Sequence, residues 1–76
     1  MTKYIIKNNL PKKIIADTGE MTKRKAARFF LGLVNHLSTN DYKIKVVFRN
    51  EKGKDLRGTI QVEIDGFYYY VELYKE

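Results

Sequence analysis

The chain has 76 residues, which is enough for one domain at the short end of the range that folds alone. It contains no cysteine, which excludes a disulfide framework and thiolate metal sites and fits a reducing compartment. Fifteen Lys and Arg outnumber nine Asp and Glu, for a formal net charge of +6, and 43% hydrophobic residues suffice for a modest core.

The positive charge is concentrated in the first half of the chain. Residues 1–38 carry eight Lys and Arg against Asp17 and Glu20, a net +6, whereas residues 39–76 carry seven charges of each sign. Such an asymmetry bears on binding partners rather than on fold. It points to a polyanion such as nucleic acid, or to an acidic protein surface.

No long apolar stretch interrupts this polar sequence. Lys3 and Lys7 bracket only Tyr4-Ile5-Ile6, which is too short for a signal peptide, and no run approaches the roughly 20 apolar residues of a membrane span. We therefore expect a cytoplasmic protein without membrane contact.

The first element is predicted to be a short strand. Lys3–Lys7 contains the β-branched pair Ile5-Ile6, and Asn8-Asn9-Leu10-Pro11 then has the composition of a turn. The segment Lys12–Ala16 is interpreted as either a second short strand or an extended connection.

A helix is predicted from about residue 20 to 38. Apolar residues recur there at spacings of three and four: Ala26, Phe30, Leu33, Val34 and Leu37. The apolar arc is widened to about half of the circumference by Ala27, Phe29 and Leu31. We expect so wide an arc to be embraced by a curled sheet, or to contact a second copy of the chain through Leu31, as in a homodimer.

Two positions compete for the start of this helix. Asp17-Thr18-Gly19-Glu20 has the pattern of a capping box, and Thr22 is a rival N-cap. A start at Asp17 or Thr18 would move the cations that follow into the second turn, where the helix dipole acts on them less.

Strands are predicted after the helix ends at Ser38-Thr39-Asn40-Asp41, because the apolar period changes from 3.6 to 2. Tyr42–Arg49 forms an amphipathic strand, and residues 50–55 form a polar hairpin loop. Asp65-Gly66 lies between two further alternating runs, and this dipeptide is typical of a two-residue type I′ turn.

A two-residue turn fixes the register of the last two strands. On the apolar face the predicted pairs are Ile64 with Phe67, Val62 with Tyr69, Ile60 with Val71, and Gly58 with Leu73. On the polar face they are Glu63 with Tyr68, Gln61 with Tyr70, Thr59 with Glu72, and Arg57 with Tyr74. The predicted fold is α+β in the order β(β)-α-β-β-β, one antiparallel sheet on one long helix, with the N-terminal strand at an edge.

The first candidate binding site is the basic helix cluster of Lys23, Arg24, Lys25 and Arg28, which Lys12 and Lys13 would extend. One helix turn brings several cations within a Debye length of roughly 8–10 Å, as a phosphate backbone requires. A bound anion would relieve the repulsion between these cations and the helix dipole, and it could use free backbone N–H groups. The simpler interpretation is a solvated helix face.

The second candidate is the polar face of the sheet, a secondary interface composed of Lys43, Lys45, Arg49, Tyr68, Tyr70 and Tyr74. Interleaved aromatics and cations bind single-stranded nucleic acid, and Tyr and Arg are also enriched at protein interfaces. Cross-strand packing of the tyrosines is the simpler interpretation. Because the second half of the chain is neutral, the sequence favours a protein partner here.

The sequence indicates no catalytic residue, metal site or cofactor. His36 is the only histidine, and no Ser or Asp can be assigned to it as a partner. Neither a phosphate-binding glycine loop nor the spacing of metal ligands occurs. We therefore expect a binding protein and not an enzyme.

The order of strand, helix and three-strand meander, with the opening Tyr4-Ile5-Ile6-Lys7, resembles some small anti-CRISPR proteins. That resemblance implies a phage or mobile-element inhibitor that binds a nucleic-acid-handling complex. Three functions follow from the sequence. The protein could associate with nucleic acid through the basic helix cluster. It could inhibit a host protein complex through the tyrosine-bearing polar face of the sheet, the basic helix cluster, or both. It could also be a basic subunit of a larger assembly.

Overall fold

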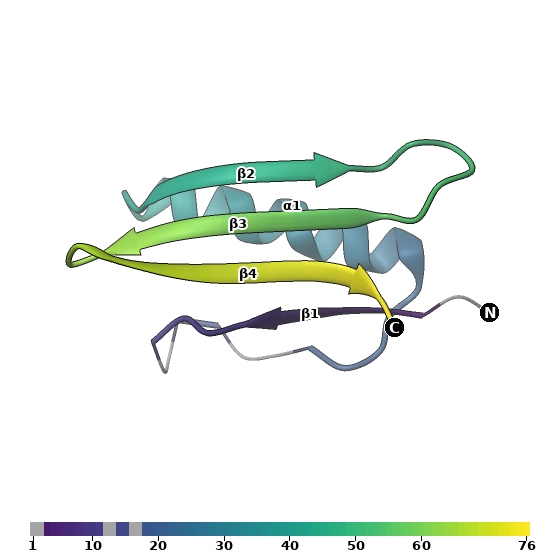
Figure 1. Ribbon diagram of the computed structural model, residues 1–76, viewed down its shortest axis with the longest axis horizontal. Helices are drawn as coiled ribbons and strands as arrows, with labels where there is room; N and C mark the ends of the chain where they lie inside the picture. The colour runs from purple at the N-terminus through teal and green to yellow at the C-terminus, as the bar shows by residue number, and fades with distance from the viewer. Residues whose placement is uncertain (1–2, 12–13, 16–17) are drawn as a thin grey trace.

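A computed structural model describes residues 3–11, 14–15 and 18–76. These residues form β1 (Tyr4–Asn8), α1 (Lys23–Thr39), β2 (Lys43–Arg49), β3 (Arg57–Ile64) and β4 (Phe67–Lys75). The strands make one antiparallel sheet in the order β1-β4-β3-β2 (Figure 1). The predicted α+β class is confirmed, with the N-terminal strand at an edge of the sheet.

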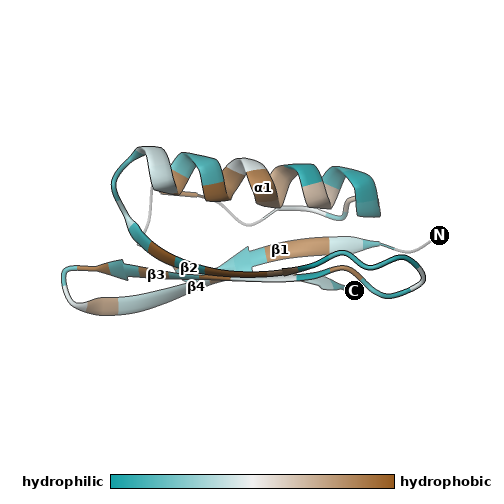
Figure 2. Cartoon of the chain, turned by 90° about the horizontal axis from the view of Figure 1, so that it is seen from above, coloured by the Kyte–Doolittle hydropathy of each residue, from teal (hydrophilic) through white to brown (hydrophobic). Residues whose placement is uncertain are grey.

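The molecule has two layers. Figure 2 shows α1 and the described parts of the connection from β1 to α1 on the same side of the sheet. Among the described elements, none covers the opposite side, which we call the outer face. The fold therefore has one covered face that forms the core and one sheet face that is open to solvent.

The hairpin of β3 and β4 forms in the predicted register. Asp65 and Gly66 have φ values of 51° and 81°, and a type I′ turn needs positive φ at both positions. Seven of the predicted pairs are present, from Ile64–Phe67 to Gly58–Leu73. The eighth predicted pair, Arg57 with Tyr74, lies outside the ladder of β3 and β4, which ends at Gly58–Leu73.

The connection between β1 and α1 contains no strand among its described residues. Lys12, Lys13 and Ala16 of the predicted second strand lie outside the described residues, while Ile14 and Ile15 are half-buried and pack against the core. An isolated bridge closes this connection, since Tyr4 and Met21 exchange two backbone hydrogen bonds of 2.8 Å. For Ile14 and Ile15, apolar burial replaces strand pairing.

Phe30 is the centre of the core. It is fully buried, and its ring stacks on Phe48 with centroids 5.3 Å apart. The ring also lies directly over Gly58 of β3, where an added Cβ would be 2.6 Å from Phe30 Cζ. A glycine at position 58 is therefore required for the helix to approach the sheet this closely.

Tyr4 joins three segments that are distant in sequence. Its side chain is 1% exposed, and its hydroxyl accepts a 3.2 Å hydrogen bond from the buried backbone N–H of Leu56. Its backbone pairs with Met21 as described above. Tyr4 thus fixes the start of α1 and the end of the loop between β2 and β3 against β1.

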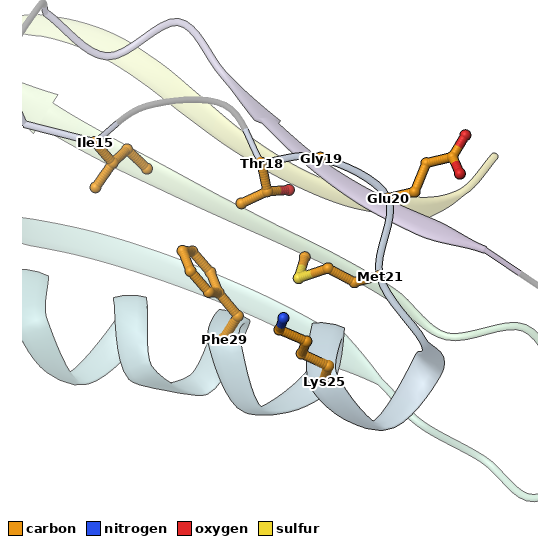
Figure 3. Close-up of a pocket in the computed structure, with 7 residues that line it drawn as sticks. All are labelled: Ile15, Thr18, Gly19, Glu20, Met21, Lys25 and Phe29. Atoms are coloured by element: carbon orange, nitrogen blue, oxygen red, sulfur yellow. The ribbon is translucent and has the colours of Figure 1, made fainter.

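The two edges of the wide apolar arc on α1 differ. Phe29 is 41% exposed and lines a groove together with Ile15 (Figure 3), so the connection before α1 flanks this edge. Leu31 belongs to the other edge and is 50% exposed. Contact of Leu31 with a second copy of the chain stays a prediction.

We expect Gly58→Ala to destabilise the protein by about 1–3 kcal/mol, because the new methyl group must displace the packed ring of Phe30. Gly32→Ala is the matched control, since Gly32 is exposed on α1 with no atom within 4 Å of the added Cβ. That change should stabilise the helix by about 0.5–1 kcal/mol. Urea unfolding measures both; equal effects of the two variants would contradict the packing of Phe30 on Gly58.

Candidate functional site

Thr22 is the N-cap of α1. It is extended, with φ −68° and ψ 160°, and its hydroxyl accepts a 3.3 Å hydrogen bond from the N–H of Lys25. Thr18 cannot cap the helix, because its hydroxyl accepts from the backbone N–H of Ile6 at 2.9 Å. Asp17 lies outside the described residues. Of the two predicted starts, the one at Thr22 is therefore confirmed.

This start places the basic helix cluster at the helix N-terminus. Lys23, Arg24 and Lys25 occupy the first turn, Arg28 follows one turn later, and the first turn holds no acidic residue. At about 100° per residue, Arg24, Lys25 and Arg28 fall within an arc of about 100°. All three are exposed. The structure thus brings three of the four predicted cations together on the side of α1 that faces away from the sheet.

Lys23 has a different role from the other three cations. Its side chain is half-buried, and its ammonium donates a 3.1 Å hydrogen bond to the carbonyl oxygen of Lys54. It thereby ties the start of α1 to the loop between β2 and β3. None of the ion pairs found in the described parts of the chain includes a residue of this cluster. Lys12 and Lys13, the predicted extension, lie outside the described residues.

A surface groove of about 550 Å³ adjoins the cluster, and sequence reasoning missed it. Figure 3 shows Lys25 and Phe29 of α1 facing Met21 and Thr18 of the preceding connection. Glu20 lies at its rim and is engaged elsewhere, since its carboxylate is 2.8 Å from the Lys3 ammonium. That hydrogen bond holds the pKa of Glu20 below its ordinary value and raises the pKa of Lys3. The paired Glu20 therefore contributes little to neutralising Lys25.

The outer face carries more positive charge than the neutral second half of the sequence suggested. By register, five cations and two carboxylates of the strands point to this face: Lys7, Lys43, Lys45, Arg49 and Arg57, with Glu63 and Glu72. All five cations are exposed. The other acidic residues after position 38 lie in turns, loops and the last residue of the chain: Asp41, Glu51, Asp55, Asp65 and Glu76. The face therefore has a net charge of +3.

All six residues of the predicted secondary interface share the outer face, but its tyrosines are not equivalent. Tyr68 and Tyr70 are 56% and 41% exposed. Tyr74 is half-buried and stands opposite Ile5, whose exposure is only 9%. Tyr74 therefore contributes to packing, whereas Tyr68 and Tyr70 are available to a partner. Since α1 covers the other side of the sheet, the two candidate surfaces lie on opposite sides of the domain (Figure 2).

His36 is exposed in the last turn of α1, with the side-chain nitrogen of Asn40 3.5 Å from its Nδ1. Within the described residues, no three His, Cys, Asp or Glu side chains gather closely enough to hold a metal ion. Nor does any helix in the described parts of the chain have the length and apolar content needed to cross a membrane.

Comparisons of this chain with family models, curated proteins and solved structures find no match. Its functional interpretation therefore rests on the basic helix cluster and the outer face.

We expect Thr22→Ala to lower the free energy of unfolding by about 0.5–2 kcal/mol, because the N–H of Lys25 loses its acceptor. Thr39→Ala is the control, since Thr39 is an exposed threonine at the other end of α1. That substitution should change stability by less than about 0.5 kcal/mol. Thermal unfolding followed by circular dichroism measures the stability of both variants. If Thr39→Ala lowers the stability and Thr22→Ala does not, Thr22 is not the N-cap.

Proposed function

We propose that this protein binds nucleic acid without catalysing a reaction, and that its basic helix cluster contacts the phosphate backbone. The observation that carries the proposal is the start of α1 at Lys23. This start puts Lys23, Arg24 and Lys25 in the first helix turn, which contains no acidic residue. A cap at Asp17 or Thr18 would put these cations in the second turn, where the helix dipole acts on them less.

The first turn is electrostatically unfavourable as it stands. Cations near a helix N-terminus oppose the positive end of the helix dipole by a few tenths of a kcal/mol each, and they also repel one another. A phosphate between Arg24 and Arg28 would remove both penalties. The first N–H groups of a helix lack intrahelical acceptors; that of Lys25 already donates to the Thr22 hydroxyl, and those of Lys23 and Arg24 add donors for the same anion.

Contacts of this kind fix a protein on nucleic acid but do not read its sequence. Lysine and arginine act on phosphates whose geometry recurs along the polymer, and each contact releases counterions. The proposed binding is therefore independent of sequence and strongly dependent on salt.

A second function is supported by the open outer face. Exposed Tyr68 and Tyr70 share the outer face with Arg49, and this surface suits a protein partner because Tyr and Arg are common at the centres of interfaces. On this alternative, the protein would be an inhibitor from a phage or mobile element that docks on a nucleic-acid-handling complex.

The first test removes the three exposed cations of the cluster together, as Arg24→Gln, Lys25→Gln and Arg28→Gln, because glutamine preserves helix propensity. Affinity for a DNA duplex should fall for all sequences, and the slope of log K against log salt should become less negative by roughly 0.9 for each phosphate that the variant no longer neutralises. Titrations by fluorescence anisotropy at several salt concentrations measure this.

A matched comparison of single changes guards against an effect of net charge alone. Arg28→Gln should weaken binding more than Lys52→Gln, which removes one exposed charge from the loop between β2 and β3. No binding of the unmodified protein to DNA or RNA at roughly 50 mM salt would refute the proposal, since phosphate contacts are strongest at low salt.

A change at the cap separates binding from folding. Thr22→Asp retains an oxygen that can accept from the N–H of Lys25, and its charge is favourable at a helix N-terminus, so stability should be kept or raised. The same carboxylate would repel a phosphate at the first turn and weaken binding to DNA. Circular dichroism measures the stability of Thr22→Asp, and anisotropy measures its affinity for DNA. A fall in stability together with the fall in affinity would contradict the prediction that only binding is affected.

A further inference from the structure

We propose that the outer face is a second binding site, which takes single-stranded nucleic acid by stacking its bases on Tyr68 and Tyr70. The proposal rests on the proposed function in one respect, because it takes nucleic acid as the class of polymer that is bound. It does not rest on the basic helix cluster, which lies on the other side of the sheet (Figure 2).

Tyr68 and Tyr70 form an ordered pair of exposed rings. They are two residues apart on the same face of β4, which places their Cα atoms roughly 7 Å apart. Both positions are paired with β3, whereas the ladder of β4 with β1 ends at Asn8–Val71. At Tyr70 the pairing continues past β1, because Asn9 Oδ1 accepts from the Tyr70 N–H at 2.7 Å and the Asn9 N–H donates to the Tyr70 carbonyl at 3.1 Å. The backbone that presents the rings is thus held in place.

A shallow hollow lies beside each of these rings. The hollow at Tyr70 is about 240 Å³ and is lined by Lys7, Asn8, Asn9 and Glu72. The hollow at Tyr68 is about 200 Å³ and is lined by Lys43, Ile44, Lys45, Gln61 and Glu63. Both are smaller than the roughly 300–1,000 Å³ of small-molecule sites. Each combines an aromatic ring, a cation and an amide side chain, which suits one base of a polymer better than a whole cofactor.

The charge on this face favours a polyanion. Arg49 and Arg57 stand directly opposite each other in the register of β2 and β3, and like charges in that position repel. Neither takes part in the ion pairs found among the described residues. A phosphate bound between the two guanidinium groups would offset the repulsion.

The two carboxylates of the face do not cancel this field. Glu63 is 3.8 Å from the Lys43 ammonium, and Glu72 stands opposite Lys7 in the register of β1 and β4. Each carboxylate therefore has a neighbouring cation. The net +3 of the face remains on Lys45, Arg49 and Arg57.

A single strand fits this surface better than a duplex does. Bases in a duplex are stacked on one another, whereas an unpaired base offers a free ring face to an aromatic side chain. Exposed Tyr68 and Tyr70 could stack on unpaired bases directly, whereas stacking on the bases of a duplex would require the duplex to be distorted first. An acidic protein partner would use the same charges and is an outcome that the experiment distinguishes.

The test is titration of the full chain with a labelled single-stranded oligothymidylate of about ten nucleotides, followed by anisotropy. Tyr68→Leu and Tyr70→Leu should each weaken binding by about 5- to 150-fold, because each removes one stacking ring. Tyr70→Phe is the matched control, since it keeps the ring and should bind like the unmodified protein. Circular dichroism establishes that each variant is folded.

The cations of the face give a second readout. Arg49→Gln and Arg57→Gln should each make the salt slope less negative by roughly 0.7, the value for one phosphate of a single strand. The tyrosine variants should leave this slope unchanged, because stacking releases no counterions.

Failure of this inference is distinct from failure of the proposed function. If the leucine variants bind the single strand as tightly as the unmodified protein, or if only duplex is bound, the inference is overturned while binding through α1 stands. If Arg24→Gln and Arg28→Gln leave nucleic-acid binding unchanged but the leucine variants abolish it, binding at the outer face is supported and binding through α1 is refuted. Absence of single-strand binding together with loss of a protein partner on Tyr70→Leu overturns the inference in favour of an interface.

Discussion

The close approach of Phe30 to the bare backbone of Gly58 sets the distance between helix and sheet, and the rest of the structure depends on it. With the ring fully buried and stacked on Phe48, α1 lies on the covered face. All described apolar packing of the helix is thereby directed to one side of the sheet. The opposite side receives no cover and presents its alternate residues to solvent.

This one-sided packing also decides where charge is displayed. Tyr4 fixes the start of α1 through its bridge to Met21, so that the cap falls at Thr22 and the basic helix cluster begins the helix. On the outer face, alternation along the strands gathers the cations of three strands, while turns and loops carry most of the acidic residues. The protein thus has two positively charged surfaces that one flat ligand cannot occupy together.

The parts of the fold that local physics controls were predictable. Asp65-Gly66 determined a hairpin whose register is confirmed over seven pairs. A two-residue type I′ turn fixes which residues of the two strands lie opposite each other. The N-cap was predicted only as a choice between two positions. It was settled by the hydrogen bond from the Ile6 N–H to Thr18, which joins residues twelve positions apart and which no local pattern reveals. The groove at Lys25 and Phe29 was missed for the same reason.

By itself, the sequence determined the elements, their order, the register of the hairpin and the concentration of cations before position 29, because these follow from neighbours along the chain. Only the tertiary structure decided which charges share a surface. Counting residues 39–76 gave neutrality, yet the pleat of the sheet puts Lys45, Arg49 and Arg57 on one face, whereas most of the acidic residues lie in turns and loops and not on that face of the strands. Electrostatic attraction depends on distance in space, and the fold rearranges those distances.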